Sequence, residues 1–154
     1  MLIHIGRGNT YTRELKEMEI HTAVLENRYL KAVFLPEFGG RLWELWDKYT
    51  GRNLLYTNDV LQFSNLAVRN AWFSGGVEWN IGIIGHNPFT TEPLYTAQIV
   101  NEDGEPVLRM YEYERIRKVT YQMDFWLEKD SSVFELPDAY CKRGKRSSTN
   151  VLVE

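Results

Sequence analysis

The sequence predicts an all-β protein, built as an antiparallel β-sandwich. Short runs of residues alternate between apolar and polar, turn-forming residues separate these runs, and aromatic side chains make up 14% of the chain. The 154 residues are 44% hydrophobic and 25% charged. This composition is ordinary for a globular protein, and a chain of this length buries enough surface to hold a core without disulfides. We therefore expect one domain, or part of a larger one.

Residues 1–14 are polar and form a lead-in to the domain. Four short strands are then predicted in a meander, over residues 18–24, 29–35, 41–47 and 52–56. Pro36 ends the second strand because proline cannot donate to a ladder. Gly39 and Gly40 form a tight connection into the third strand, and Lys48 to Gly51 form a turn before the fourth.

Residues 58–90 differ from the predicted strands on either side. They contain many glycines, asparagines and serines together with aromatic residues. Long loops in compact domains are usually functional or disordered, and the aromatic content argues against disorder. The functional site is therefore expected in this segment.

Strand-like alternation resumes between residues 94 and 136. Asn101 to Gly104 is a strong hairpin signal, and alternating runs at 109–118 and 119–127 predict two long strands. A further strand is expected to begin at Val133. Together these strands predict a large antiparallel sheet. Residues 137–154 show no continuing pattern and are rich in lysine and arginine, so we expect a flexible, solvated tail.

Two neighbouring motifs concentrate chemically useful side chains. Residues 74–80 read Ser-Gly-Gly-Val-Glu-Trp-Asn, and residues 85–88 read Gly-His-Asn-Pro. Glu78 can accept hydrogen bonds from sugar hydroxyls or act as a base, and His86 titrates near neutrality. Trp72 and Trp79 offer flat surfaces on which a pyranose could stack. A glycine-rich loop supported by a buried glutamate and histidine is the structural alternative.

A third motif, Pro36-Glu37-Phe38-Gly39-Gly40-Arg41 followed by Trp43, carries a family resemblance. Together with residues 75–80 and 85–88, it resembles galactose-mutarotase-like domains of the aldose 1-epimerase superfamily. The match is to an uncharacterised bacterial branch that is often fused to tetratricopeptide repeats. The resemblance covers residues 15–136, which look like the N-terminal half of such a domain. It implies a β-supersandwich that binds carbohydrate in an open cleft.

The resemblance also implies roles for individual residues. Mutarotases use a carboxylate base and a histidine acid, and His86 is the best match for the sugar-contacting histidine. The family's base lies in the later half of the domain, so Glu78 is a candidate that belongs to the motif of this branch. The predicted site comprises His86 and Glu78 as catalytic residues and, as substrate-binding residues, Arg41, Trp72, Trp79, Asn80 and Asn87.

Carbohydrate binding is therefore the predicted function. The alternatives are a sugar-active enzyme of the aldose 1-epimerase or glycoside hydrolase type, and a non-catalytic protein-interaction module. Half of a supersandwich would leave sheet edges exposed, which predicts a homo-oligomer formed through those edges.

Charge and motif content exclude several other classes. The chain has 18 basic and 21 acidic residues, and this net charge of −3 argues against a nucleic-acid partner. No apolar run is long enough to span a membrane, and no secretory signal is present, so a cytoplasmic protein is expected. Cys141 is the single cysteine, and three scattered histidines do not predict a zinc site. No cofactor is expected.

Overall fold

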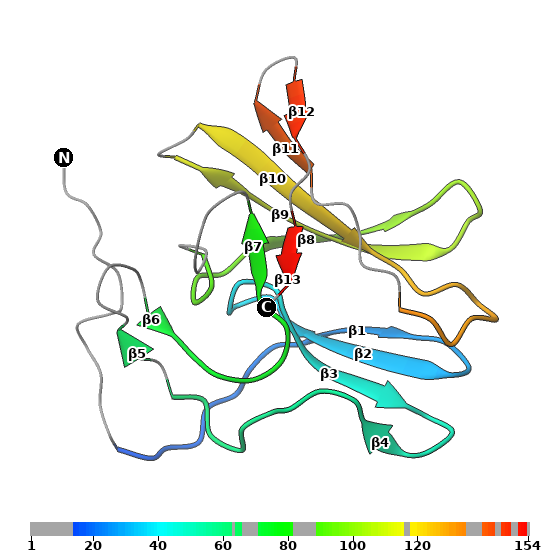
Figure 1. Cartoon of the computed structure of the whole chain (residues 1–154), viewed down its shortest axis with the longest axis horizontal. Coiled ribbons are helices and arrows are strands. Elements are labelled where there is room, and N and C mark those ends of the chain that lie inside the picture. The colour runs from blue at the N-terminus through cyan, green and yellow to red at the C-terminus, as the bar shows by residue number, and fades with distance from the viewer. Residues whose placement is uncertain are drawn as a thin grey trace.

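The computed structural model describes residues 14–62, 64–65, 71–81, 89–115, 118–134, 140–143, 146–148 and 151–153. Within them the chain forms thirteen β-strands and no helix, and every strand pair is antiparallel. The predicted all-β class is confirmed. A four-stranded and a five-stranded sheet lie one below the other in Figure 1, an arrangement consistent with a β-sandwich. Two smaller sheets hold two strands each.

The four-stranded sheet is the meander that the sequence predicts. Its strands follow one another in the order β1 (Ala23–Glu26), β2 (Leu30–Leu35), β3 (Arg41–Asp47) and β4 (Arg52–Asn53). The third strand has the predicted bounds. The first begins later than predicted and the fourth ends earlier. At the fourth, the Asn53 side chain replaces a ladder partner, because its Oδ1 accepts from the backbone N–H groups of Leu45 and Leu55 at 3.1 Å each.

A β-bulge at Trp43 changes which side chains of β3 face the main core. Val33 pairs with Glu44 and Phe34 pairs with Leu42, so Trp43 is the extra residue on its strand. Leu42 and Leu45 are three residues apart, and plain alternation would place them on opposite faces of the sheet. The bulge lets both pack on the main core. It leaves Arg41, opposite Leu35, on the other face.

The five-stranded sheet has the strand order β12-β11-β10-β9-β8. β8 (Tyr95–Val100) and β9 (Pro106–Glu114) form the predicted hairpin, and β10 (Val119–Phe125) follows after a tight turn at Lys118, which has a φ of 57°. The predicted strand at 109–118 thus begins earlier and ends earlier. Val133 and Phe134 are not in a strand, so the strand predicted to begin there is wrong for these two residues.

Strands are also present among the described residues beyond 137, where the sequence shows no continuing pattern. β11 (Tyr140–Arg143) pairs with β10 and with β12 (Arg146–Ser148), so both extend the five-stranded sheet. β13 (Val151–Val153) returns to pair with β7 (Trp79–Ile81). The remaining pair is β5 (Ser64–Asn65) with β6 (Ala71–Trp72). β11 and β12 are short and mostly polar, and β13 reads Val-Leu-Val, so none of the three carries an alternation of apolar and polar residues from which a strand could be predicted.

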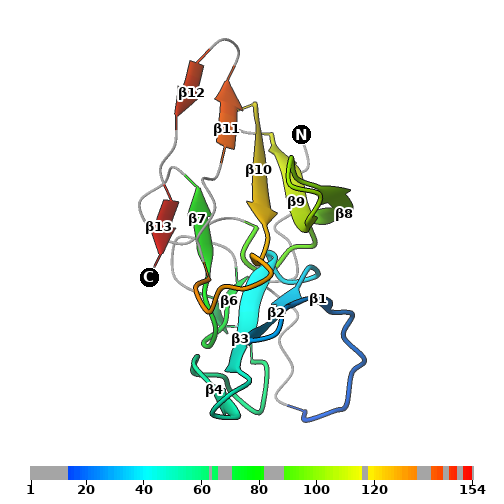
Figure 2. The ribbon, with the colours of Figure 1, turned by 90° about the vertical axis from the view of Figure 1, so that its right-hand side faces the viewer.

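The main core lies between the two larger sheets, which Figure 2 shows from the side. β2 contributes Ala32 and Phe34, and β10 contributes Met123 and Phe125. The rings of Phe34 and Phe125 lie 4.9 Å apart between centroids, so they join the two sheets directly. A second, smaller core of Leu35, Phe38 and Phe73 covers the other face of the four-stranded sheet. The candidate site lies on this second face.

Candidate functional site

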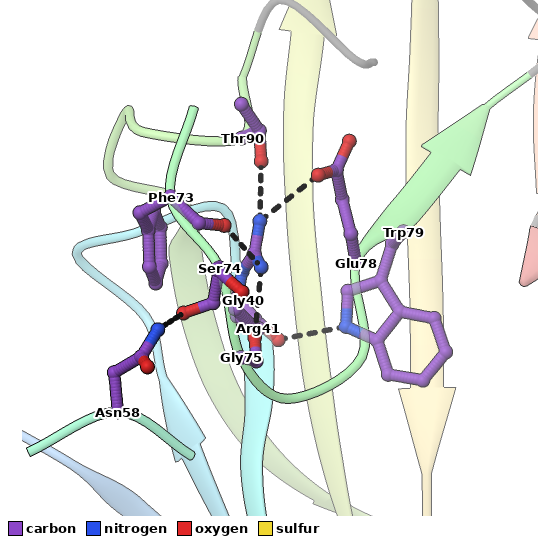
Figure 3. A network of polar contacts seen from close by, with 9 residues as sticks. All are labelled: Gly40, Arg41, Asn58, Phe73, Ser74, Gly75, Glu78, Trp79 and Thr90. Atoms are coloured by element: carbon purple, nitrogen blue, oxygen red, sulfur yellow. Dashed lines mark hydrogen bonds and ion pairs between the residues drawn. The ribbon is translucent and has the colours of Figure 1, made fainter. Parts of the chain in front are cut away.

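Arg41 is the centre of a buried polar network at the start of β3. Its side chain is 3% exposed and donates hydrogen bonds from two nitrogens to four acceptors. Nη1 donates to the backbone carbonyls of Phe73 at 2.9 Å and Gly75 at 2.8 Å. Nη2 donates to Glu78 Oε2 and to Thr90 Oγ1, at 2.9 Å each. Figure 3 shows how these contacts tie β3 to the segments that carry residues 73–78 and Thr90.

The Arg41–Glu78 ion pair is shielded from water. Both residues are buried, and the guanidinium carbon lies 3.9 Å from the centroid of the Phe73 ring, which adds a cation–π contact. Burial lowers the pKa of Arg41 below its ordinary value, and the Glu78 carboxylate partly offsets this effect. Arg41 Nε is buried without a hydrogen-bond partner in the described part of the chain. The guanidinium is nevertheless held by charge and by four hydrogen bonds, so its orientation is fixed.

Glycines let the segments of this network approach one another closely. Gly39 has a φ of 69°, and a Cβ atom there would lie 2.7 Å from the Phe89 carbonyl oxygen. Gly75 has a φ of 113°, and a Cβ there would lie 2.8 Å from the Trp43 ring. Both positions need left-handed backbone and the absence of a side chain. Gly39 and Gly75 are therefore steric requirements of the network.

Trp79 belongs to the main core. It is 4% exposed, its ring lies 5.0 Å from that of Phe125, and its Nε1 donates to the Gly40 carbonyl at 2.8 Å. Because side chains alternate along a strand, Asn80 projects from the opposite side of β7. Glu78, just before the strand, turns toward Arg41 (Figure 3). Glu78 and Asn80 are both buried, so residues 78–80 direct two polar side chains away from the main core and the indole of Trp79 into it.

Four of the seven predicted site residues are brought together by this arrangement. Arg41 contacts Glu78 directly, and Trp79 and Asn80 follow Glu78 on β7. Trp72 lies in β6, where it pairs with Ser64 of β5. His86 and Asn87 lie outside the described residues.

Three residues of the network have no counterpart in the sequence prediction. Thr90 accepts from Arg41, Phe73 supplies a carbonyl and a ring, and Asn58 Nδ2 donates to the Ser74 carbonyl at 2.8 Å. All three lie in the segment 58–90, where the sequence predicts the site, but nothing local distinguishes Phe73 and Asn58 from their neighbours. Thr90 begins a Thr-Thr pair two residues after the Gly-His-Asn-Pro motif, and nothing local marks it as a partner of an arginine. Its role depends on a long-range contact.

Two other features bear on function. In the described segments, no three histidine, cysteine, aspartate or glutamate side chains are grouped so that they could hold a metal ion. In the same segments, no helix is long and apolar enough to cross a membrane.

Comparison with known proteins supports the coarser part of the family prediction. A TPR-domain containing protein from Parabacteroides distasonis ATCC 8503 has a similar fold, with a TM-score of 0.67 and 21% sequence identity. The alignment covers 79% of this chain and 20% of that protein, so the chain spans about a fifth of its length. Residues 8–150 match the family described as Domain of unknown function (DUF5107). The match continues past residue 136, where the resemblance found in the sequence ends. The chain therefore belongs to the DUF5107 family.

Proposed function

We propose that this domain binds carbohydrate at the polar side of β7, through Glu78 and Asn80, with Arg41 as the positioning residue. One observation carries the proposal. The two motifs that resemble mutarotase-like domains, residues 36–41 and 75–80, lie far apart in the sequence but form one unit. Arg41 pairs with Glu78 at 2.9 Å, Trp79 donates to Gly40, and Leu42 bridges to Val77.

The chemistry of this unit suits a polyhydroxylated ligand. Sugar hydroxyls both donate and accept, and the site supplies a carboxylate, an amide and the hydroxyl of Thr90. Glu78 is buried, and Arg41 donates to its Oε2 at 2.9 Å, so the carboxylate is held in one orientation. A carboxylate fixed in this way loses little freedom on binding, which favours affinity.

The finer assignment to the mutarotase-like superfamily is part of the same proposal. It gives His86 the part of a sugar-contacting acid and leaves Trp72 and Asn87 as further contacts. Anomer exchange would require a base to take the anomeric hydroxyl proton and an acid to protonate the ring oxygen. A pure binding domain needs neither step, so an activity assay separates the two functions.

The test is a panel of mono- and oligosaccharides titrated into the protein and followed by tryptophan fluorescence. We expect saturable quenching by one sugar class, with affinity reduced at least about 10-fold in Glu78→Gln and in His86→Ala, the loss of about one hydrogen bond to a charged group. Glu128→Gln, at an exposed position, is the matched control and should bind like the parent. Circular dichroism establishes that each variant is folded.

Failure of every sugar to bind the folded parent would overturn the proposal. If one sugar binds, NMR exchange spectroscopy on that sugar then distinguishes an epimerase from a binding domain. Accelerated anomer exchange that is lost in His86→Ala would establish the enzyme.

A further inference from the structure

We infer that the outer edge of β8 binds the same edge of a second copy of this chain, so that two five-stranded sheets join across a two-fold axis. β8 is the last strand of its sheet and has only β9 beside it among the described strands. Figure 2 shows it at the margin of the sheet. This inference is independent of the proposed sugar site, since it rests on a different strand.

The sequence of β8 differs from that of the other edge strands of the two larger sheets. Tyr95 to Val100 reads Tyr-Thr-Ala-Gln-Ile-Val, six residues without a charge, a proline or a glycine. Soluble proteins protect exposed edges by keeping them short or by placing charges on them. β1 carries Glu26, β4 is two residues long and includes Arg52, and β12 is three residues long and begins with Arg146. β8 is long and lacks these protections.

Each face of β8 has side chains that are exposed to solvent. Tyr95 is 62% exposed and Val100 is 69% exposed, and Thr96 and Gln98 are also exposed. The Tyr95 ring stacks on that of Tyr111 from β9, with centroids 5.5 Å apart and planes inclined by 25°. This contact orders an aromatic side chain at the edge, which reduces the entropy lost when a partner packs against it.

Symmetry makes an uncharged edge suitable for self-pairing. In a two-fold interface each residue meets the matching patch of the second copy, so a charged strand would oppose its own like charges. A two-fold axis normal to the sheet keeps side chains on their own face and allows registers centred on Ala97 or on Gln98. The first places Thr96 opposite Gln98 of the second copy, and the second places the two Gln98 side chains opposite each other. Every such pair is uncharged.

The interface is small, so the dimer should dissociate on dilution. Six residues of strand bury less than a standard protein–protein interface, and each cross-strand pair contributes only about 0.2–1 kcal/mol. Sedimentation velocity of the full chain over a concentration series is therefore the measurement. We expect the weight-average sedimentation coefficient of the parent to rise with concentration from the monomer value to the dimer value.

The decisive variant is the double substitution Thr96→Lys/Gln98→Lys, which sets lysines opposite one another in either register. Both positions are exposed, so the fold should be retained. This variant should remain monomeric, and so should Thr96→Glu/Gln98→Glu. An equimolar mixture of the two should form a heterodimer, because the opposed charges become complementary, and added salt should weaken it. Val24→Lys on β1 is the control and should dimerise like the parent.

Three outcomes would overturn the inference. The parent could remain monomeric across the series, the lysine variant could still dimerise, or Val24→Lys could be the substitution that abolishes the dimer, which would assign the contact to β1. Restored association in the mixture cannot be explained by a simple loss of folding in the charged variants.

Discussion

At the scale of single residues, Arg41 determines how the two sequence motifs meet. Its planar fork reaches two carbonyls, a carboxylate and a hydroxyl at once. An ammonium group is a compact point charge on a flexible stem and cannot reproduce this geometry. The charge at this position is therefore less important than the shape of the group that carries it.

Replacing Arg41 by lysine should cost about 3–5 kcal/mol of unfolding free energy, the range for breaking a buried pair. The charge is kept, but most of the hydrogen bonds are lost and the Glu78 carboxylate is poorly compensated. Urea denaturation measures the change. Arg109→Lys is the matched control. Arg109 binds Asp124 with two hydrogen bonds of 2.7 Å each, but the pair is partly exposed and should contribute about 1 kcal/mol or less. Equal losses in the two variants would contradict this account of Arg41.

The glycines of the network provide a second test at this scale. Gly39 and Gly51 have nearly the same φ, 69° and 67°, but nothing lies within 4 Å of a Cβ at Gly51. Gly51→Ala should therefore show only the cost of left-handed backbone, about 1–2 kcal/mol. Gly39→Ala should add the overlap with Phe89 and Thr90, about 1–3 kcal/mol more. The difference between the two denaturation midpoints measures the part of the lost stability that is due to steric overlap. Equal midpoints would contradict the predicted overlap at Gly39.

At the scale of elements, the sequence predicts strands where alternation and turn chemistry agree. β3 has its predicted bounds because Gly40 precedes it and the Asp47 side chain closes the turn behind it. The bulge at Trp43 could not be predicted, since it depends on the pairing of β2 with β3. The strands after Pro137 were missed for a similar reason: β13 forms on β7, and the partner is remote in sequence.

The candidate site, too, could be predicted only where a local motif marks it. Residues 74–80 carry a visible motif, and Glu78 indeed lies in a buried polar network. Thr90 and the carbonyl of Phe73 join it only because Arg41 reaches them across the fold. A local pattern identifies a residue with unusual chemistry. A partner that contributes its backbone carbonyl, as Phe73 does, leaves no trace in side-chain identity, and the hydroxyl of Thr90 is one of many in the chain.

The turn after β3 makes the stability of the protein depend on pH in the acidic range. Hydrogen bonds from the Thr50 side chain and from backbone N–H groups, Tyr49 among them, lower the pKa of Asp47. A lowered pKa in the folded state contributes stability above the unfolded pKa, near 4, and that contribution is lost as the pH falls through the folded value.

We therefore expect the unfolding free energy of the parent to fall more steeply between pH 5 and about pH 2 than that of Asp47→Asn. Urea denaturation at a series of pH values measures both slopes. Asp103→Asn, on the exposed turn between β8 and β9, is the control and should follow the parent. Identical slopes for the parent and Asp47→Asn would show that this turn does not contribute to the acid dependence.

At the scale of the whole molecule, one core serves both larger sheets. Phe125 of β10 contacts Phe34 of β2 and Trp79 of β7, so the sheets cannot lose their packing independently. A single cooperative unfolding transition follows from this arrangement.

Phe125→Ala should lower the unfolding free energy by about 3–5 kcal/mol, because it opens a cavity where the two sheets meet. Tryptophan fluorescence and far-ultraviolet circular dichroism should report the same midpoint for parent and variant. Tyr49→Ala, at an almost fully exposed side chain, should change stability by no more than about 0.5 kcal/mol. Separate transitions by the two probes would show that the sheets unfold independently.

The pairing of β7 with β13 has a consequence for the order of folding. The meander of β1 to β4 forms through contacts between neighbours in the chain, which close quickly. β7 obtains its strand partner only when residues 151–153 return to it, and a closure over so long a stretch is slow. On a growing polypeptide, Glu78 and Asn80 would thus wait for residues synthesised much later, and the candidate site would be among the last parts of the molecule to take shape.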